Sequence, residues 1–257
     1  MIHDIAARGF GATVDAYRRS RPSYPASAIG WLIERLAIGS GSKVVDVGAR
    51  TGKLTAQLLP TGAQMIAVEP LESMRAALAE ELPTVSVIGG SAESLPLANA
   101  SADSIVVGQA FHWFDLPRAL PEFHRVLRSG GRLGVIWNDL DTTVDWVANL
   151  NAIIAVARTG TPHPSISGSA KLGESFGPRR RHRFAHAHLH DRASLLDRVA
   201  SMSFVAVQPD AVRAHILADV EALVAGHPKL TGRHTFRLPY VTHAWWAERI
   251  DRDPASA

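Results

Sequence analysis

The sequence predicts an α/β protein built on a doubly wound, parallel sheet, and three observations support this fold class. From Lys43 onward, short apolar and β-branched runs alternate with stretches whose apolar residues repeat at helical spacing. The short runs are almost continuously apolar, which is typical of strands that are buried on both faces. Glycine and proline residues punctuate the alternation, and right-handed crossovers would place helices on both faces of the sheet.

The first half of the chain holds five expected strands and the helices that connect them. The run KVVDV lies between Gly41 and Gly48, and the helix that follows it ends at Pro60. A turn at Ser129-Gly130-Gly131 precedes the fifth run. We expect strands at residues 43–47, 65–68, 85–88, 104–107 and 132–137. We expect the connecting helices at residues 51–59, 71–82 and 117–127.

The two flanks of this region are less regular. Residues 1–40 hold a lead rich in Arg, Pro and Tyr, followed by an expected helix at residues 26–36. A loop rich in Gly, Ser and Pro at residues 159–178 is long enough to act as a lid over a site. Around it we expect helices at residues 144–157, 192–200 and 211–225, and strands at residues 183–190 and 233–240.

We interpret the chain as a single domain of residues 1–257, since this length can bury one large core. Within it we expect four segments. They are an N-terminal helical cap at 1–40, a cofactor-binding core at 41–138, an insertion or lid at 139–180, and C-terminal strands and helices that complete the sheet at 181–257.

The composition is that of a globular protein and excludes several classes. Of the residues, 46% are hydrophobic and 20% are charged, and no apolar run approaches the roughly 18–20 residues that cross a membrane. The first residues lack the features of a secretory signal, so we expect a cytoplasmic protein with no membrane partner. The absence of cysteine excludes disulfides, thiolate nucleophiles and cysteine metal sites.

The charge of the chain disfavours nucleic acid as its partner. The formal net charge of +3 is small for this length, and positive charge is dense only at Arg179–Arg181 and Arg183. Such a run is more often a solvated loop or strand edge. The composition leaves a homodimer open.

A glycine-containing turn follows the first expected strand, in the run DVGARTGK from Asp46 to Lys53. Glycines at a strand-to-helix turn let the backbone approach a ligand, and the carboxyl ends of parallel strands are where open α/β sheets bind ligands. Glu69 ends the second strand, where a carboxylate can accept hydrogen bonds from ribose hydroxyls. A dinucleotide fingerprint is disfavoured, because its second and third glycine positions hold Arg50 and Lys53.

Four blocks in the chain carry a resemblance to a known family. They are, in order, VVDVGARTGKLT, AVEPLESM, GGSAESLPLANASADSIVVGQAFHWFD and RVLRSGGRLGVIWN. The chain resembles the class I S-adenosylmethionine-dependent methyltransferases, in the broad group that includes trans-aconitate-type small-molecule enzymes. The resemblance implies a seven-stranded Rossmann-like sheet, S-adenosylmethionine as cofactor and methyl transfer to a small-molecule acceptor, by O- or carboxyl-methylation.

The resemblance also implies a set of cofactor-binding residues. Asp46, Gly48 and Gly52 would shape the methionine end of the pocket, and Glu69 would hold the ribose. Pro70, Met74, Ala92 and Glu93 would lie near the adenine. Gln109 and Phe111 belong to the segment where the transferring methyl group points. Tyr17 and Arg21 would cap the site, with Arg21 pairing with the cofactor carboxylate.

Arg50 is the main departure from the family pattern, which has glycine at this position. The arginine side chain has three possible effects: it turns outward, it binds the methionine carboxylate, or it blocks the pocket. We favour tolerated binding. The alternative is a non-catalytic binding protein on the same fold. A third alternative, an RNA methyltransferase, requires a basic groove from Arg18, Arg19 and Arg21 to the Arg179 cluster.

Histidines supply the candidate catalytic chemistry. His112 lies among aromatic residues at a strand end and can act as a general base for a hydroxyl acceptor, or can simply pack there. Asp115 can cap the helix that follows. His182, His186, His188 and His190 alternate along an expected strand, but no carboxylate ligand pattern accompanies them. We therefore expect no metal site.

Overall fold

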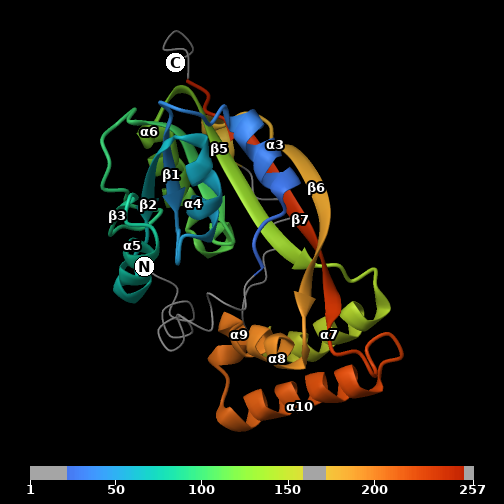
Figure 1. Cartoon of the computed structure of the whole chain (residues 1–257). Coiled ribbons are helices and arrows are strands. Elements are labelled where there is room, and N and C mark those ends of the chain that lie inside the picture. Colours follow the sequence, from blue (N-terminus) through green and yellow to red (C-terminus); the bar gives the residue numbers. More distant parts are fainter. Residues whose placement is uncertain (1–21, 159–171, 252–257) are drawn as a thin grey trace. The chain divides into compact units, whose positions relative to one another are not determined.

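The structure is a computed structural model that describes residues 22–158 and 172–251 (Figure 1). These residues divide into two compact units. The sheet unit comprises described residues 23–137, 172–184 and 242–251, and the helical unit comprises Pro22 and residues 138–158 and 185–241. The prediction of a single domain with the four segments named above stays a prediction.

Seven strands form one sheet in the described part of the chain, in the order β3-β2-β1-β4-β5-β7-β6. The sheet is mixed, because β7 runs antiparallel, and the other pairings along β3-β2-β1-β4-β5 are parallel. This confirms the predicted doubly wound, mostly parallel sheet of the Rossmann-like class. The strands are β1 (Lys43–Val47), β2 (Gln64–Val68), β3 (Ser86–Ile88), β4 (Ala102–Gly108), β5 (Leu127–Leu140), β6 (Arg180–His190) and β7 (Phe236–Glu248).

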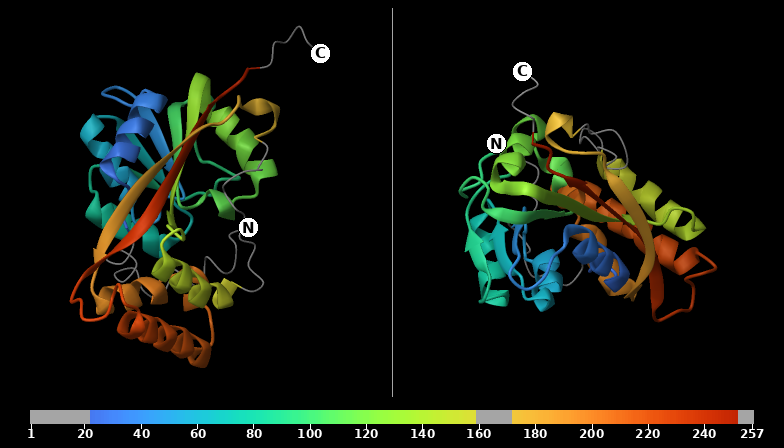
Figure 2. Two further views of the ribbon diagram at one scale, coloured as in Figure 1. Left: turned by 90° about the vertical axis from the view of Figure 1, so that its right-hand side faces the viewer. Right: turned by 90° about the horizontal axis from the view of Figure 1, so that it is seen from above.

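Helices cover both faces of the sheet within the sheet unit (Figure 2). The core on one face contains α6, and the core on the other face contains α3, α4 and α5. Adjacent residues of β1 enter different cores, Val44 the second and Val45 the first, which explains why the strand is apolar at successive positions. The helices are α3 (Ala26–Leu36), α4 (Lys53–Leu58), α5 (Glu72–Glu81) and α6 (Leu116–Val126), with short 3-10 turns η1 (Leu59–Thr61), η2 (Phe111–Trp113) and η4 (Gly173–Ser175).

Strand β5 is longer than the run that predicts it. It begins at Leu127, and the expected turn at residues 129–131 is an irregularity within the strand. Between Ala102 and Ser104 of β4, the paired residues on β5 move from Leu127 to Arg132. Gly130 accommodates the bulge with a φ of 71°, a conformation that glycine adopts at little cost.

Strand β7 also extends beyond its predicted end at residue 240 and continues to Glu248. Its second half contains Trp245 and Trp246, which are adjacent and both buried, in the cores on opposite faces of the sheet. A strand that is buried on both faces has no apolar alternation, so the period-2 pattern that indicates a half-buried strand is missing there.

The helical unit has its own apolar core, to which α7, α8, α9 and α10 contribute together with Phe236, Leu238 and Tyr240. Helix α8 begins with a capping box in which the Asp191 carboxylate accepts from the Ser194 N–H at 2.8 Å and the Ser194 hydroxyl accepts from the Asp191 N–H at 2.9 Å. The bounds are α7 (Asp145–Ala155), η3 (Val156–Arg158), α8 (Arg192–Ala200), α9 (Ser203–Ala206) and α10 (Asp210–Gly226). In the described ranges, none of the helices has the length and apolar character needed to cross a membrane.

Gly134 sets how closely α3 packs on β5, and this generates a prediction. A Cβ atom at residue 134 would lie 2.6 Å from Leu36 Cδ1 and 2.9 Å from Leu32 Cδ1. We expect Gly134→Val to lower the free energy of unfolding by about 1–3 kcal/mol, because α3 must move or its leucines must leave their rotamers. Urea unfolding measures the change.

Gly30→Ala, in the middle of the same helix, is the matched control for this prediction. No atom lies within 4 Å of a Cβ placed at residue 30. This variant should gain up to about 1 kcal/mol from helix propensity. Equal stability of Gly134→Val and the parent protein would contradict the packing account.

Candidate functional site

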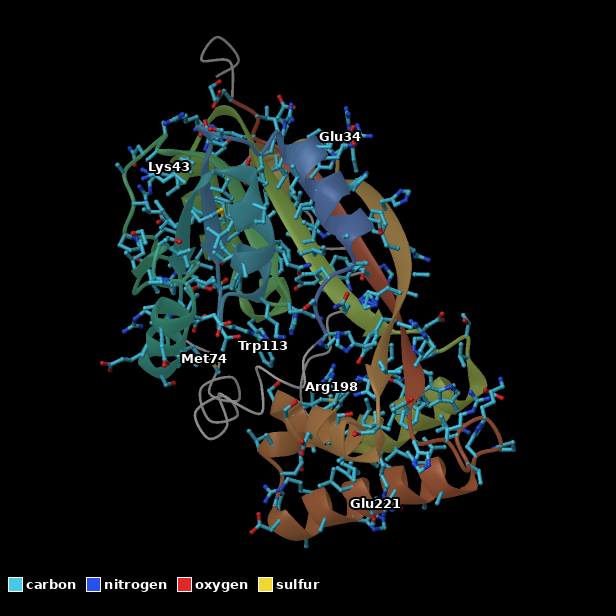
Figure 3. All side chains as sticks on the ribbon, viewed as in Figure 1. Glu34, Lys43, Met74, Trp113, Arg198 and Glu221 are labelled. Atoms are coloured by element: carbon cyan, nitrogen blue, oxygen red, sulfur yellow. The ribbon has the colours of Figure 1, made fainter. Side chains whose placement is uncertain are left out.

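The strand order reverses between β1 and β4, which are neighbours in the sheet. From β1 the chain moves outward through β2 to β3, and from β4 it moves the other way to β5. Ligands of open α/β sheets bind beyond the carboxyl ends of the strands at such a reversal. In Figure 3, Met74 and Trp113 lie toward the end of the sheet unit opposite Lys43, the first residue of β1, and so mark this carboxyl edge.

Two non-glycine residues at this edge have a left-handed backbone. Arg50 follows β1 with a φ of 53°, and Gln109 follows β4 with a φ of 55°. For a residue other than glycine, the left-handed backbone conformation costs roughly 1–2 kcal/mol relative to the right-handed one. Strain of this kind is concentrated at functional sites, where the surrounding structure enforces it.

The turn after β1 requires glycine at two positions. A Cβ at Gly48, where φ is 71°, would lie 2.8 Å from the Ala110 Cβ, and a Cβ at Gly52, where φ is 79°, would lie 2.9 Å from the Leu82 Cδ1. The turn therefore packs closely against the segment after β4 on one side and against the end of α5 on the other. This explains the two glycines of the run DVGARTGK on steric grounds.

Glu69 organises the loops after β1 and β2. Its carboxylate is 3% exposed, and it accepts from the Arg50 N–H at 2.9 Å through Oε2 and from the Leu71 N–H at 3.1 Å through Oε1. Burial raises the pKa of Glu69, while the two N–H donors and the charges of Arg50 and Arg75 oppose this rise. Each carboxylate oxygen has a second lone pair with which to accept from a ligand.

Arg75 fixes the backbone around this carboxylate. Its Nη1 donates to the carbonyl oxygens of Glu69 at 3.0 Å and Pro70 at 2.7 Å. Met74, one residue earlier on α5, is fully buried. The Glu69–Pro70 segment is therefore held by backbone and guanidinium hydrogen bonds before any ligand arrives.

Asp46, near the end of β1, is a buried carboxyl group with one partnered oxygen. The Thr55 hydroxyl donates to Oδ2 at 2.6 Å, and Oδ1 accepts no hydrogen bond from the part of the chain that the structure describes. Burial raises the pKa of Asp46 to about 7, hydrogen bonds from Thr55 lower it in part, and the charge of Glu69 adds to the rise. Because Oδ1 is buried at a ligand-binding edge and lacks a hydrogen bond there, it is a candidate acceptor for a hydrogen bond from a ligand.

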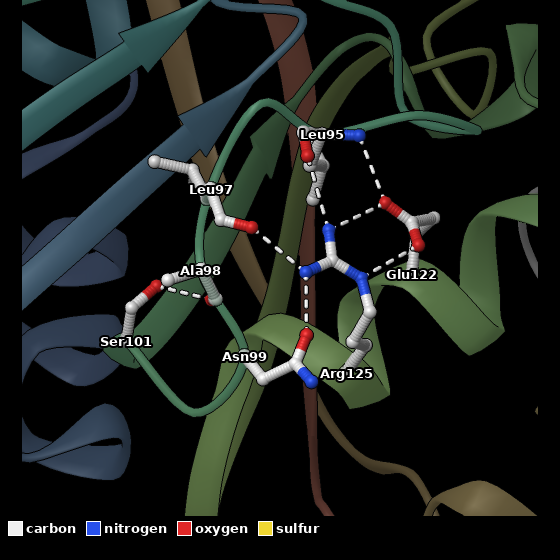
Figure 4. A network of polar contacts seen from close by, with 7 residues as sticks. All are labelled: Leu95, Leu97, Ala98, Asn99, Ser101, Glu122 and Arg125. Carbon is white, nitrogen blue, oxygen red and sulfur yellow. Dashed lines mark hydrogen bonds and ion pairs between the residues drawn. The ribbon is translucent and has the colours of Figure 1, made fainter.

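The segment after β3 is pinned by Arg125 of α6 (Figure 4). The guanidinium donates to the carbonyl oxygens of Leu95 and Leu97, to the side chain of Asn99 and to Glu122. Glu122 in turn accepts from the Leu95 N–H at 2.9 Å, and the Arg125 hydrogen bond lowers the pKa of Glu122. This network fixes the loop on which Ala92 and Glu93 lie.

Ala92 is buried, and one carboxylate oxygen of Glu93 already accepts a hydrogen bond from the protein. The Glu93 Oε1 accepts from the Asp115 N–H at 2.9 Å, which joins the segment after β3 to the segment after η2. Asp115 occupies the N-cap position of α6, but its side chain makes no capping hydrogen bond. One carboxylate oxygen of Glu93 is thus used to close the loop.

The segment after β4 brings aromatic side chains to the same edge. Phe111 is buried and meets Trp245 of β7 edge-to-face, with ring centroids 5.2 Å apart. His112 is half-buried, and its ring centroid lies 4.9 Å from that of Trp113. The Gln109 N–H donates to the Ile136 carbonyl at 3.0 Å, which places Gln109 beside the end of β5.

The structure thus brings together many of the residues predicted from sequence. Gly48, Arg50, Glu69 and Gln109 lie in the turns at one edge of the sheet, while Tyr17 and Arg21 lie outside the described residues. Thr55 and Trp245 also belong to this edge, and the sequence reading missed them. Thr55 has a local signal, a hydroxyl on the helix after the turn. Trp245 has none, because β7 is remote in the chain.

The row of histidines predicted from sequence lies on β6. Burial lowers the pKa of His186, and burial with the charge of His188 lowers the pKa of His190 to about 4, so both imidazoles are neutral at pH 7. Within residues 22–158 and 172–251, no group of three or more His, Asp or Glu is placed to hold a metal ion.

Comparison with known proteins identifies the family to which this fold belongs. A family model described as a methyltransferase domain matches residues 45–135. An uncharacterized methyltransferase of Mycobacterium tuberculosis is 42% identical over 233 residues, which are 91% of this chain and 92% of that protein. The malonyl-[acyl-carrier protein] O-methyltransferase of Methylococcus capsulatus is 40% identical over 99 residues, 36% of each chain.

Among solved structures, a type II methyltransferase candidate from Anaeromyxobacter dehalogenans has a TM-score of 0.63 at 21% identity, and the match covers 89% of this chain and 97% of that one. This likeness supports the fold. The sheet order, the glycine turn after β1 and the buried acid after β2 together define an enzyme of the class I methyltransferase fold. The chain belongs to the S-adenosylmethionine-dependent class I methyltransferases.

The raised pKa of Asp46 generates a prediction about pH and stability. A carboxyl group whose pKa rises from 3.8 to about 7 on folding contributes stability that is present below pH 4 and is lost as the pH rises through 7. Asparagine at this position has no charge to bury. The free energy of unfolding of Asp46→Asn, relative to the parent, should therefore rise between pH 4 and pH 8 by roughly 4 kcal/mol.

Urea unfolding of both proteins without added ligand, at several pH values, measures this difference. Glu80→Gln removes an exposed carboxylate from α5 and controls for the change in net charge. A difference between Asp46→Asn and the parent that stays constant from pH 4 to pH 8 would show that Asp46 is not buried in this way.

Proposed function

We propose that this methyltransferase binds S-adenosylmethionine at the carboxyl edge of β1, β2 and β4 and methylates a small-molecule acceptor on oxygen. The observation that carries the proposal is the Glu69 carboxylate. It is buried, anchored by two backbone N–H groups, and able to accept further hydrogen bonds. Such a group is suited to a pair of ribose hydroxyls.

The other predicted residues fit the remaining parts of this cofactor. Asp46 has an oxygen with no hydrogen bond from the described residues, and Gly48 lets the backbone pass close to the segment after β4. These two residues, with Gly52, would hold the methionine end. Pro70, Met74, Ala92 and Glu93 come from the loops and helix next to Glu69 and would surround the adenine.

Arg50 is compatible with this proposal. It adopts the left-handed conformation expected of the glycine it replaces, and its N–H still donates to Glu69. The backbone of the turn therefore keeps the form that the cofactor needs, and the positive charge favours the ionised form of Glu69. The strain is part of the turn and does not by itself close the site.

Methyl transfer requires the protein mainly to position the two reactants. When bound, the sulfonium of the cofactor supplies an electrophilic methyl group. The chain's own residues hold the two reactants in line and exclude water, which the buried Phe111 and Trp245 favour. A carboxylate acceptor needs no base, whereas for a hydroxyl acceptor His112 is the proposed group that takes the proton.

Two further observations bear on the acceptor. The Methylococcus relative is an O-methyltransferase by name, which supports transfer to oxygen. The basic run at the start of β6 is divided between the two faces of the sheet, since the Arg179 guanidinium lies over Trp245 and that of Arg180 over Trp246. A divided run is a poor surface for RNA, and a small molecule is favoured.

Calorimetric titration with S-adenosylmethionine and S-adenosylhomocysteine tests the proposal. We expect the parent protein to bind both with micromolar affinity. Glu69→Gln should weaken binding by about 10- to 100-fold, because a neutral amide replaces a charged acceptor. Glu72→Gln, an exposed neighbour on α5, should leave the affinity unchanged and serves as the matched control.

Arg50→Gly distinguishes this proposal from the alternative, a protein of the same fold that no longer binds the cofactor. If Arg50 is tolerated, the parent and Arg50→Gly should bind within a few-fold of each other. Absence of binding by the parent, with binding restored in Arg50→Gly, would overturn the proposal and favour a non-catalytic binding protein. Thermal unfolding of each variant shows whether it is folded under the conditions of the titration.

A further inference from the structure

Helix α6 begins without a hydrogen bond from its own N-cap side chain. Asp115 is the N-cap residue, and its carbonyl oxygen accepts from the Arg118 N–H at 2.9 Å and from the Ala119 N–H at 2.8 Å. Its carboxylate makes no capping hydrogen bond. In a capping box, a glutamate at the third helical position accepts from the N–H of the N-cap residue. That position holds Arg118 here, and a guanidinium has no acceptor.

Glu93 supplies this acceptor from another part of the chain. Its Oε1 accepts from the Asp115 N–H at 2.9 Å, which is the hydrogen bond that a glutamate within the helix would make in a capping box. The negative charge of the carboxylate also lies at the positive end of the helix dipole, where it is favourable. The segment after β3 therefore caps α6 from 22 positions earlier in the sequence.

The same segment is joined to the other end of α6. Arg125, in the last turn of the helix, donates to the carbonyl oxygens of Leu95 at 3.0 Å and Leu97 at 2.7 Å (Figure 4). Glu122 accepts from the Leu95 N–H at 2.9 Å. Because hydrogen bonds connect the segment to both ends of α6, we expect the segment and the helix to move together.

The start of α6 is close in the chain to His112, the proposed base. Two residues separate His112 from Asp115. The residues that flank η2 also pack on the turn after β1, since a Cβ at Gly48 would lie 2.8 Å from the Ala110 Cβ and 3.4 Å from the Phe114 Cζ. The position of η2 therefore depends on two supports, which are the turn after β1 and, through Asp115, the segment after β3.

The proposed cofactor would contact both of these supports. Gly48 would lie at its methionine end, and Ala92 and Glu93 would lie near its adenine. Binding reduces the motion of the groups that a ligand contacts, and this restraint also affects segments that are packed against them or hydrogen-bonded to them. A ligand that spans this edge therefore restrains η2 from both supports.

We infer that Glu93 is a positioning residue that caps α6 and thereby holds η2, with His112, in place when the cofactor is bound. Binding of the cofactor thus orders the segment from which the proposed base acts. This inference rests on the proposed function. It gives Glu93 a role on the acceptor side of the reaction, in addition to its place near the adenine.

Hydrogen–deuterium exchange of the full chain, with and without S-adenosylhomocysteine, tests the inference. In the parent protein we expect the ligand to slow exchange in residues 89–97 and in residues 110–118. In Glu93→Ala, exchange of residues 110–118 without ligand should be about 3- to 10-fold faster, because a helix that loses a cap opens more readily at its first turn. The ligand should still protect residues 89–97 of this variant, but it should no longer protect residues 110–118.

Two further variants distinguish the hydrogen bond from the charge. Glu93→Gln keeps an oxygen that accepts from the Asp115 N–H, so it should restore exchange of residues 110–118 to within about two-fold of the parent. Asp115→Pro removes the donor. Proline is compatible with the backbone there, because Asp115 has a φ of −73° and the preceding Phe114 is extended. In the Asp115→Pro background, Glu93→Ala should have no further effect on residues 110–118.

Glu80→Ala is the matched control, because it truncates an exposed glutamate on α5. It should leave exchange of residues 110–118 unchanged. Unchanged exchange of these residues in Glu93→Ala would overturn the inference. Equal effects of Glu93→Gln and Glu93→Ala would also overturn it, because the charge and not the hydrogen bond would then be responsible.

The response to the ligand distinguishes failure of this inference from failure of the proposed function. If S-adenosylhomocysteine protects residues 89–97 of the parent but not residues 110–118, the proposed function stands and the inference fails. If it protects neither range, the proposed function fails, and the inference fails with it.

Discussion

The carboxylate of Glu69 accepts hydrogen bonds from the backbone N–H groups of Arg50 and Leu71, and the binding edge of the sheet depends on this interaction. It ties the turn after β1 to the loop after β2 in a buried place, where an unpaired N–H costs roughly 1–3 kcal/mol. Arg50 has a left-handed conformation and its N–H donates to Glu69, so the strain at residue 50 and the anchoring of the acid belong to the same turn.

The rest of the edge is built around these two loops. Gly48 lets the turn approach the segment after β4, Gln109 links that segment to β5, and Phe111 meets Trp245 of β7. The side of β1 and β2 presents the buried carboxyl groups of Asp46 and Glu69, which suit hydroxyl and ammonium donors.

The fold could be predicted from sequence because each parallel strand is a short apolar run set between helices and glycines. The site could be predicted in part, since the glycine turn and Glu69 are local signals at the ends of strands. The extent of β7 could not, because Trp245 and Trp246 are both buried and leave no alternation. The pairing among β5, β7 and β6 brings Arg179 next to Trp245, which the positions of these two residues along the chain do not indicate. The backbone conformation of Arg50 could be expected from the glycine that it replaces.

The central claim is that Glu69 and the strained turn at Arg50 form a cofactor site at the carboxyl edge of the sheet. A crystal structure of the protein grown with S-adenosylhomocysteine tests it most directly. We predict that the ribose hydroxyls lie within hydrogen-bond distance of the Glu69 carboxylate, with the amino acid part of the ligand toward Asp46 and Gly48. A nucleoside bound elsewhere, or no bound ligand at saturating concentration, would contradict the account.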